Sequence, residues 1–500
     1  MRTSLAALMI GLGGAAYAEA PLSAIDWLSD SVANPAPRVV TPGEEVGPAA
    51  IEQIEVTALD ATVPDVAGLL PPTATGLPRA LWGPASAEDV TARIEAVPRG
   101  LSPALNQLLV TVLLAEANAP LGGDNDSVLL ARVDRLLEIG SLDRALALLD
   151  RAGPDTPERF RRYFDVALLK GREQEACARL RARPEISPTY PARIFCLARG
   201  GDWQAAAVTL ETANSLGILT PEEDLLLARF LDPEILPDED IAPDRRTPTP
   251  LTFRMLEAVG EPLPTTGLPL AFAWADMRET RGWKARLDAG ERLARAGVLS
   301  PNQLTGLYLE RRPSASGGVW ERASAIQALE TGLAAGDTDA VASALPTAWE
   351  QMHASNLHHV LAAQYGAELA ALGLEGEAGR VARTLGLLSP GYAQVAAKSI
   401  NDSFVIALAL GIPETAIAQT DQAFAVRQGF TEPLPDGALR QLVDGGRTGE
   451  AILKAITLFA EGADGDVDGV SQAIAALRAL GLDDAARRAA LELLLADQPV

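Results

Sequence analysis

The sequence predicts an all-α protein, an α-solenoid of stacked helical hairpins that follows a Pro-rich, largely disordered N-terminal arm. Ala and Leu dominate the 500 residues and aromatic side chains make up only 5%, as is typical of helical proteins. Prolines crowd into two stretches of the chain, where they break helices. Elsewhere a glycine followed five residues later by an alanine recurs about every 30–37 residues, which indicates a helical repeat.

Residues 1–18 have the pattern of a signal peptide. Arg2 supplies a positive charge, residues 5–16 are apolar, and small residues end the segment at Ala18. This pattern predicts cleavage between Ala18 and Glu19 and export to a bacterial periplasm. The alternative, a membrane helix, needs about 20 apolar residues. No later run reaches that length, so the mature form is expected to have no integral membrane segment.

Residues 19–85 form the predicted Pro-rich arm, which holds two apolar islands. The second island, residues 51–59, is rich in β-branched residues and is predicted as an isolated strand. The first, residues 22–32, is predicted to bind a partner, and its apolar residues are Leu22, Ile25, Trp27, Leu28 and Val32. Leaving such side chains in water costs about 25 cal/mol per Å². They are therefore expected to dock, either on a partner or on the protein's own repeats.

Two helical-repeat blocks are predicted, residues 86–231 and 270–500, separated by an acidic Pro-rich hinge over residues 232–269. In the repeats, glycine permits a tight turn between helices, and the small alanine lets the second helix approach the first. The glycine–alanine pairs are Gly140 and Ala145, Gly171 and Ala176, Gly201 and Ala206, Gly373 and Ala378, Gly446 and Ala451, and Gly481 and Ala486. Looser versions lie around Gly297 and Gly336. Neither face of such a hairpin is buried alone, so neighbouring hairpins are expected to stack.

On these glycine–alanine pairs the chain resembles the tetratricopeptide-like helical-repeat family over residues 125–232 and 285–496. The family's aromatic positions are mostly missing here. The resemblance implies a superhelix whose concave surface holds peptides or other proteins. An irregular helical bundle with glycine turns is the alternative architecture.

No motif for catalysis, a cofactor or a metal stands out, so no cofactor and no catalytic or metal site is predicted. His353 and His358 are five residues apart, which does not place two ligands on one helical face; with His359 they are interpreted as a solvated or hydrogen-bonded helix end. The carboxylates of Asp464, Asp466 and Asp468 resemble the start of a calcium-binding loop. Position 12 of that loop is an alanine, which favours an acidic turn capping the next helix, with calcium left open.

Cys177 and Cys196, the two cysteines of the chain, are predicted to form a disulfide. They lie at equal distances from the centre of a predicted loop between two helices, residues 173–181 and 191–199, so antiparallel packing brings them to the same height. Helical phase places both among charged residues rather than in a core. A pair of free thiols is the alternative.

The expected function is that of a non-catalytic periplasmic scaffold or adaptor that binds protein partners of an envelope complex. Motility motors (as a flagellar motor accessory), secretion systems and cell-wall machinery are the candidate complexes. The net charge of −24 argues against nucleic acid. The alternative is a cell-wall or polysaccharide hydrolase with a degenerate motif. Soluble lytic transglycosylases are similar in having a helical superhelix, but their catalytic Glu is followed by Ser, and no such pair occurs here.

Overall fold

The computed structural model describes residues 63–122, 126–236, 243–399, 403–463 and 465–496. These residues form 25 α-helices and no strand, apart from two isolated β-bridges. The all-α prediction is therefore confirmed for the described part of the chain. None of its helices is long and apolar enough to cross a membrane.

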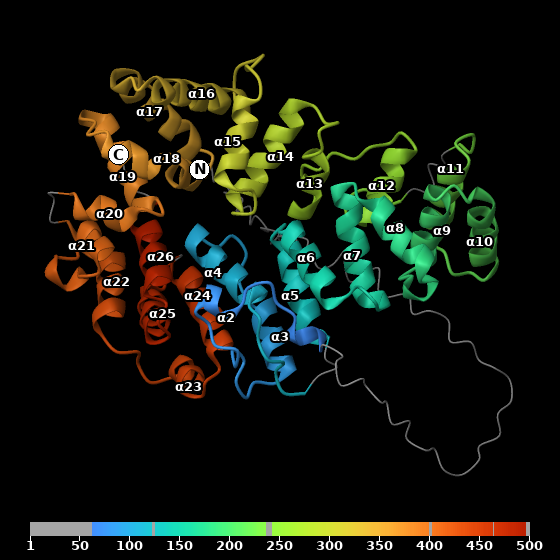
Figure 1. The fold of residues 1–500 in the computed structure, drawn as a ribbon, viewed down its shortest axis with the longest axis horizontal. Coiled ribbons are helices and arrows are strands. Elements are labelled where there is room, and N and C mark those ends of the chain that lie inside the picture. The colour runs from blue at the N-terminus through green and yellow to red at the C-terminus, as the bar shows by residue number, and fades with distance from the viewer. Residues whose placement is uncertain (1–62, 123–125, 237–242, 400–402, 464, 497–500) are drawn as a thin grey trace, which may run out of the picture.

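The helices follow one another with short connections (Figure 1). The first half of the chain contains α2 (Pro72–Thr75), α3 (Ala87–Glu95), α4 (Pro103–Leu114), α5 (Ser127–Glu138), α6 (Leu142–Ala152), α7 (Pro157–Lys170), α8 (Glu173–Ala182), α9 (Tyr190–Arg199), α10 (Trp203–Ser215), α11 (Pro221–Leu231) and α12 (Pro250–Ala258). The middle contains α13 (Ala273–Asp276), α14 (Trp283–Arg295), α15 (Pro301–Leu309), α16 (Val319–Ala335), α17 (Thr338–His353), α18 (His358–Ala371) and α19 (Gly376–Leu388). The last part contains α20 (Tyr392–Ala397), α21 (Phe404–Leu410), α22 (Asp421–Thr431), α23 (Ala438–Asp444), α24 (Thr448–Ala463), α25 (Val467–Ala479) and α26 (Asp483–Leu495). Four short 3₁₀ turns complete the described elements: η1 (Pro64–Val66), η2 (Pro184–Ile186), η3 (Leu270–Phe272) and η4 (Pro413–Thr415).

The predicted glycine–alanine pairs mark the hairpin turns. Each of the predicted glycines lies between two helices with a positive φ, the left-handed conformation that glycine adopts without strain; they are Gly140, Gly171, Gly201, Gly297, Gly336, Gly373, Gly446 and Gly481. The six paired alanines are all buried in the second helix of their hairpin. Small residues at these points let the two helices of each hairpin pack closely.

Threonine and proline set where several helices begin. Thr156, Thr189, Thr220 and Thr249 each accept a hydrogen bond from the backbone N–H three residues ahead, and proline occupies one of the first two helical positions. A side-chain oxygen at this point satisfies a backbone donor that the helix itself leaves unpaired, and proline has no N–H to satisfy. At α11 the cap is reciprocal, because Glu223 also accepts from the backbone N–H of Thr220.

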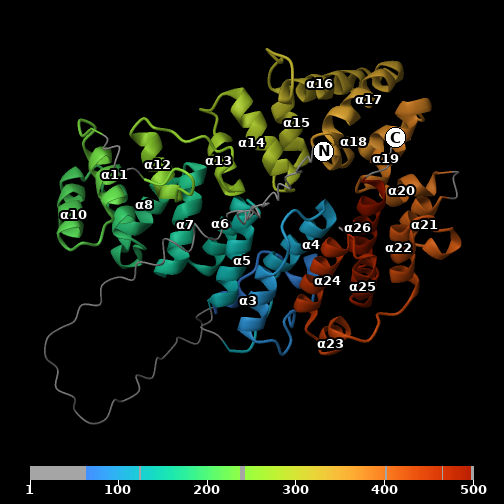
Figure 2. The ribbon, with the colours of Figure 1, turned by 180° about the vertical axis from the view of Figure 1, so that it is seen from behind.

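The chain runs outward and then returns along itself. Helices α5 to α10 lead away from the centre, and after α11 the helix α12 packs against α7, while α13 also contacts α7 (Figures 1 and 2). Helix α12 buries Leu251, Phe253, Met255 and Leu256. The predicted hinge at residues 232–269 therefore contains a packed helix. The proline-rich composition did not predict this helix, because proline breaks a helix when it lies in the interior, whereas Pro250 occupies the first position of α12.

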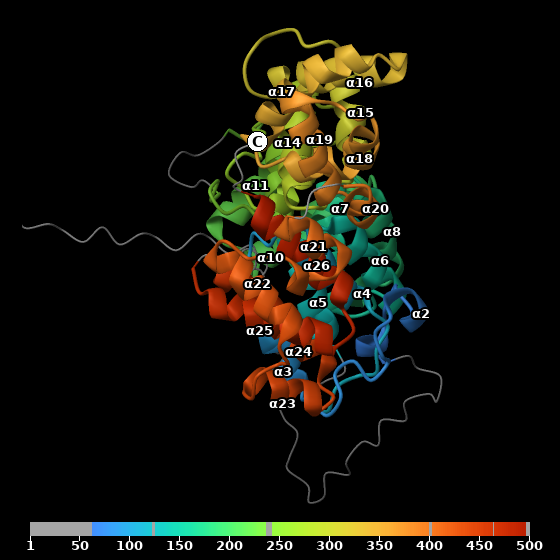
Figure 3. The ribbon, with the colours of Figure 1, turned by 90° about the vertical axis from the view of Figure 1, so that its left-hand side faces the viewer.

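A second core follows from α13 to α19, and the chain then comes back to its start. The second core is separate from the first, which joins residues 67–275 to residues 387–495. Helix α24 packs against α3 and α4, and α26 packs against α4, so the last helices lie beside the first (Figures 1 and 3). The two ends of the helical array therefore contact each other, whereas in a simple solenoid each repeat contacts only its neighbours.

Hydrogen bonds, an ion pair and one buried ring contribute to this closure. The ion pair joins Arg447, directly before α24, to Asp89 of α3 at 3.1 Å. The backbone N–H of Gly449 donates to the carbonyl of Leu81 at 2.7 Å. The ring of Trp82 is only 2% exposed and covers Gly449 so closely that an added Cβ would lie 2.4 Å from its Cζ3 atom. The N–H of Ala104, at the start of α4, donates to the carboxylate of Glu492 at 3.0 Å.

Residues 63–85 differ from the prediction of an unpacked arm. Asp65 and Arg132 are both 1% exposed. The carboxylate of Asp65 accepts from the N–H of Leu129 at 2.7 Å, near the start of α5. The Arg132 guanidinium donates to the carbonyls of Ala67, Leu113 and Ala115 at 2.6–3.1 Å. This buried arginine joins the segment to α4 and α5, and burial lowers its pKa to about 10. The remainder of the predicted arm lies outside the described residues.

Candidate binding site

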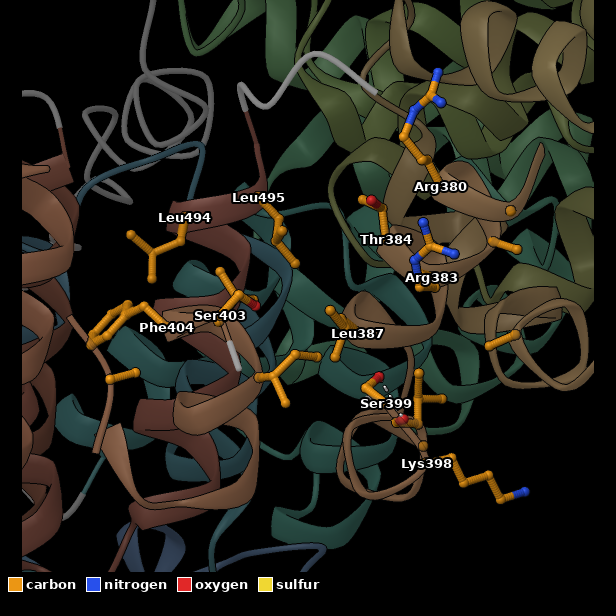
Figure 4. A pocket seen from close by; sticks show the side chains of 18 of the residues that line it. Arg380, Arg383, Thr384, Leu387, Lys398, Ser399, Ser403, Phe404, Leu494 and Leu495 are labelled. Carbon is orange, nitrogen blue, oxygen red and sulfur yellow. Dashed lines mark hydrogen bonds between the residues drawn. The ribbon is translucent and has the colours of Figure 1, made fainter. Parts of the chain in front are cut away.

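A large hollow lies between the end of the second core and the returning helices. It is lined by residues of α18, α19, α20, α21, η4, α22 and α26, and has a volume of about 1570 Å³. Figure 4 shows Arg380 and Arg383 at one end of this cavity, with Phe404, Leu494 and Leu495 across from them. We refer to it below as the α19–α26 cavity.

Helix α19 provides the charged wall of the cavity. Arg380, Arg383, Thr384 and Leu387 follow the three- and four-residue spacing of one helical face, and all four line the cavity. Helix α19 packs closely on α18 through glycines. For example, an added Cβ at Gly386 would lie 2.8 Å from the Cβ atom of Ala370. This close packing fixes the orientation of α19 and turns its two arginines into the hollow.

The cavity is cationic although the chain is strongly acidic. Its charged lining residues are Arg380, Arg383 and Lys398, and no Asp or Glu is among the described residues that line it. All three cations are exposed and have no ion pair with any described residue. By contrast, Arg322 is held between helices by Glu291 at 2.7 Å. The three positive charges are therefore free to attract an anionic group in a protein of net charge −24.

Apolar side chains surround these charges. The floor includes Leu387, Phe404 and Leu494. At the rim, Ile417 is 78% exposed. The arrangement suits a ligand with both carboxylates and apolar side chains.

The three histidines come together at the turn between α17 and α18. The rings of His353 and His358 are 5.1 Å apart, because the turn brings their faces together despite their spacing in sequence. Nε2 of His353 donates to the carbonyl of Ala496 at 3.1 Å, and Nε2 of His359 donates to that of Ala294 at 3.1 Å. Burial lowers the pKa of His358 to about 4, with smaller contributions from the other two histidines. The group links α17 and α18 to α14 and the end of α26.

The predicted disulfide is present between Cys177 on α8 and Cys196 on α9, with a Cα–Cα distance of 5.0 Å. The predicted surroundings were wrong, since both cysteines are 1% exposed. Most of the neighbouring charges do face solvent, since Arg181, Arg193 and Arg199 are exposed. Glu173 is the exception, because it is only 5% exposed and accepts hydrogen bonds from Arg199 at 2.9 Å and from Arg254 of α12 at 3.0 Å. The two cysteines are therefore buried although most of the charges near them in the sequence are exposed.

Other predicted site residues are only partly described. Ala18, Glu19 and the segment with Leu22, Ile25, Trp27, Leu28 and Val32 lie outside the described residues, as does Asp464. Asp466 precedes α25 and Asp468 lies in its first turn, without a side-chain capping bond from Asp466. No cluster of three or more potential metal ligands occurs among the described residues.

No family model matches the chain, and no curated protein or solved structure matches it. The resemblance to tetratricopeptide-like repeats therefore stands at the level of helical hairpins with glycine turns. Sequence patterns also missed the cavity itself. Arg383 carried a weak signal of an unpaired cation, because no acidic residue lies three or four positions from it in either direction, whereas Glu377 lies three positions before Arg380.

Proposed function

We propose that the chain is a non-catalytic scaffold or adaptor of the bacterial envelope that holds a protein partner in the α19–α26 cavity. The observation that carries this proposal is that Arg380, Arg383 and Lys398, which have no ion pair with any described residue, line the same cavity as a set of apolar side chains. A volume of about 1570 Å³ exceeds the roughly 300–1,000 Å³ of small-molecule pockets. It suits a segment of a polypeptide.

The same lining gives no support to the alternative hydrolase. Glycoside hydrolysis commonly uses two carboxyl groups about 5–9.5 Å apart on either side of the scissile bond. The described lining of the cavity holds arginine, lysine, amides and hydroxyls, but no carboxylate or histidine. These groups bind and orient a ligand without supplying the acid and base of that reaction.

The envelope assignment rests on the signal-peptide pattern of residues 1–18 and on the disulfide. Disulfides persist in oxidising compartments such as the periplasm. Scaffolds built of helical hairpins commonly serve large assemblies, and a motility motor, a secretion system and the cell-wall machinery are the candidates by analogy. Within this proposal the Pro-rich arm acts as a tether.

Affinity capture of the mature chain from envelope extracts tests the proposal. The variant Arg380→Glu, Arg383→Glu, Lys398→Glu reverses the charge of the cavity and should lose the partner. The control reverses three exposed cations outside the cavity that also lack a described ion pair, Arg151, Arg193 and Arg312. This control should keep the partner. A partner retained equally by both variants contradicts a role for the cavity.

A further inference from the structure

The cationic and apolar lining of the cavity matches a ligand that is acidic and apolar. Residues 22–32 of this chain have that composition. Residues 22–32 contain Trp27, four aliphatic side chains, and the carboxylates of Asp26 and Asp30. The spacing of four residues puts Asp26 and Asp30 on one face of a helix. No lysine or arginine occurs between residues 3 and 37, so no basic side chain near them in the sequence can pair with these two carboxylates.

We propose that residues 22–32 occupy the α19–α26 cavity of their own chain when no partner is bound. Asp26 and Asp30 bring two negative charges to the three cations of the cavity. The apolar side chains of the segment cover the apolar floor and the exposed rim at Ile417. This inference rests on the proposed function and adds a form of regulation, since a partner must displace the segment in order to bind.

The length of the connecting chain permits this docking. Residues 33–62 separate the segment from the first described residue, and 30 residues span up to about 100 Å when extended. Four prolines in this stretch, at positions 35, 37, 42 and 48, favour extended conformations. A compact fold of the described size has a radius of gyration of about 22 Å, so the linker reaches around it. A tethered segment is present at an effective concentration in the millimolar range.

The second apolar island is the less suitable occupant. Residues 51–59 also carry glutamates, but only three residues separate them from residue 63. Next to residue 63, the turn η1 packs against α5, and neither element lines the cavity. The link to residue 63 is thus three residues long for residues 51–59 and 30 residues long for residues 22–32, and the longer link gives the greater reach.

A cross-linking experiment on the full mature chain tests the docking. Ser29→Cys places a thiol in the segment and Thr384→Cys places one in the cavity. The native cysteines stay in their buried disulfide if no reductant is used. A short bismaleimide should then join positions 29 and 384 within one chain. The control pairs Ser29→Cys with Thr212→Cys, an exposed position of α10 outside the cavity, and should give background yield.

Charge reversal shows whether the cations hold the segment. Arg380→Glu, Arg383→Glu, Lys398→Glu should lower the cross-link yield by about threefold to fivefold per exposed pair lost. Adding Asp26→Lys and Asp30→Lys to that variant should restore the yield, and unchanged melting temperatures show that the variants fold.

Equal yields at positions 384 and 212, or a yield that charge reversal leaves unchanged, overturn the docking. A product with the mass of two chains that increases with protein concentration overturns it in favour of a second copy. Loss of the docking with retention of partner capture by the cavity contradicts only this inference. Loss of both contradicts the proposed function as well.

Discussion

Replacing Trp82 by Ala should open the contact between the two ends of the helical array. Trp82 is 2% exposed and its ring covers Gly449. Its Nε1 atom has no hydrogen-bond partner among the described residues, so the substitution removes packing without breaking a hydrogen bond. Removing a buried aromatic side chain costs about 3–5 kcal/mol.

Hydrogen exchange at the backbone amide of Gly449 reports this contact directly. That amide donates to the carbonyl of Leu81 across the closure. If the closure opens as a local unit, a loss of about 3 kcal/mol speeds its exchange by about a hundredfold. Trp203→Ala is the matched control, because Trp203 is 50% exposed on α10, and it should leave Gly449 exchange unchanged. Equal exchange in Trp82→Ala and in the unmodified protein refutes the closure.

Three further outcomes follow from buried groups. Replacing Cys177 and Cys196 by Ala should lower the free energy of unfolding by about 3 kcal/mol in the chain-entropy model, and denatured, unreduced protein should show no free thiol. Burial raises the pKa of Glu492 from 4.5 to about 7, so its carboxyl group keeps its proton to a higher pH in the folded state than in the unfolded state. The contribution of Glu492 to the free energy of unfolding should therefore fall by up to about 3 kcal/mol from pH 4.5 to 7. Glu492→Gln should remove the part of the fall that is due to Glu492, while the part due to Asp165, whose pKa burial also raises to about 7, remains; a pH profile of melting temperature that is unchanged by the variant contradicts the burial of Glu492. Arg132→Met should cost about 3–5 kcal/mol in urea unfolding, because it leaves three buried carbonyls without a donor; a cost under about 1 kcal/mol contradicts the role of this arginine.

Local rules made the hairpins predictable. A glycine that must adopt positive φ and an alanine that must fit under a neighbouring helix depend on a few adjacent residues, so their spacing marks the turns. The disulfide was predictable for a similar reason. Cys177 and Cys196 lie on adjacent antiparallel helices, and their positions relative to the loop determine their separation.

Features made by distant segments were not predictable in this way. The closure joins Leu81 and Trp82 to Gly449, and nothing within the proline-rich sequence around Trp82 indicates the surface that covers it. The α19–α26 cavity likewise depends on how residues 367–495 fold back together. Helical phase placed Cys177 and Cys196 among charged residues, but periodicity does not show that Glu173 pairs with Arg254 of a distant helix or that both cysteines are buried.

The central claim is that the α19–α26 cavity binds an acidic segment of a partner protein in the envelope. A photo-reactive amino acid at Gln394, a cavity residue on α20, tests it in intact cells by mass spectrometry of the cross-linked peptides. The account predicts a cross-link to an acidic peptide of one partner, lost when Arg380, Arg383 and Lys398 are reversed to Glu. Cross-links to neutral or basic peptides, or an acidic cross-link that survives the reversal, would contradict it.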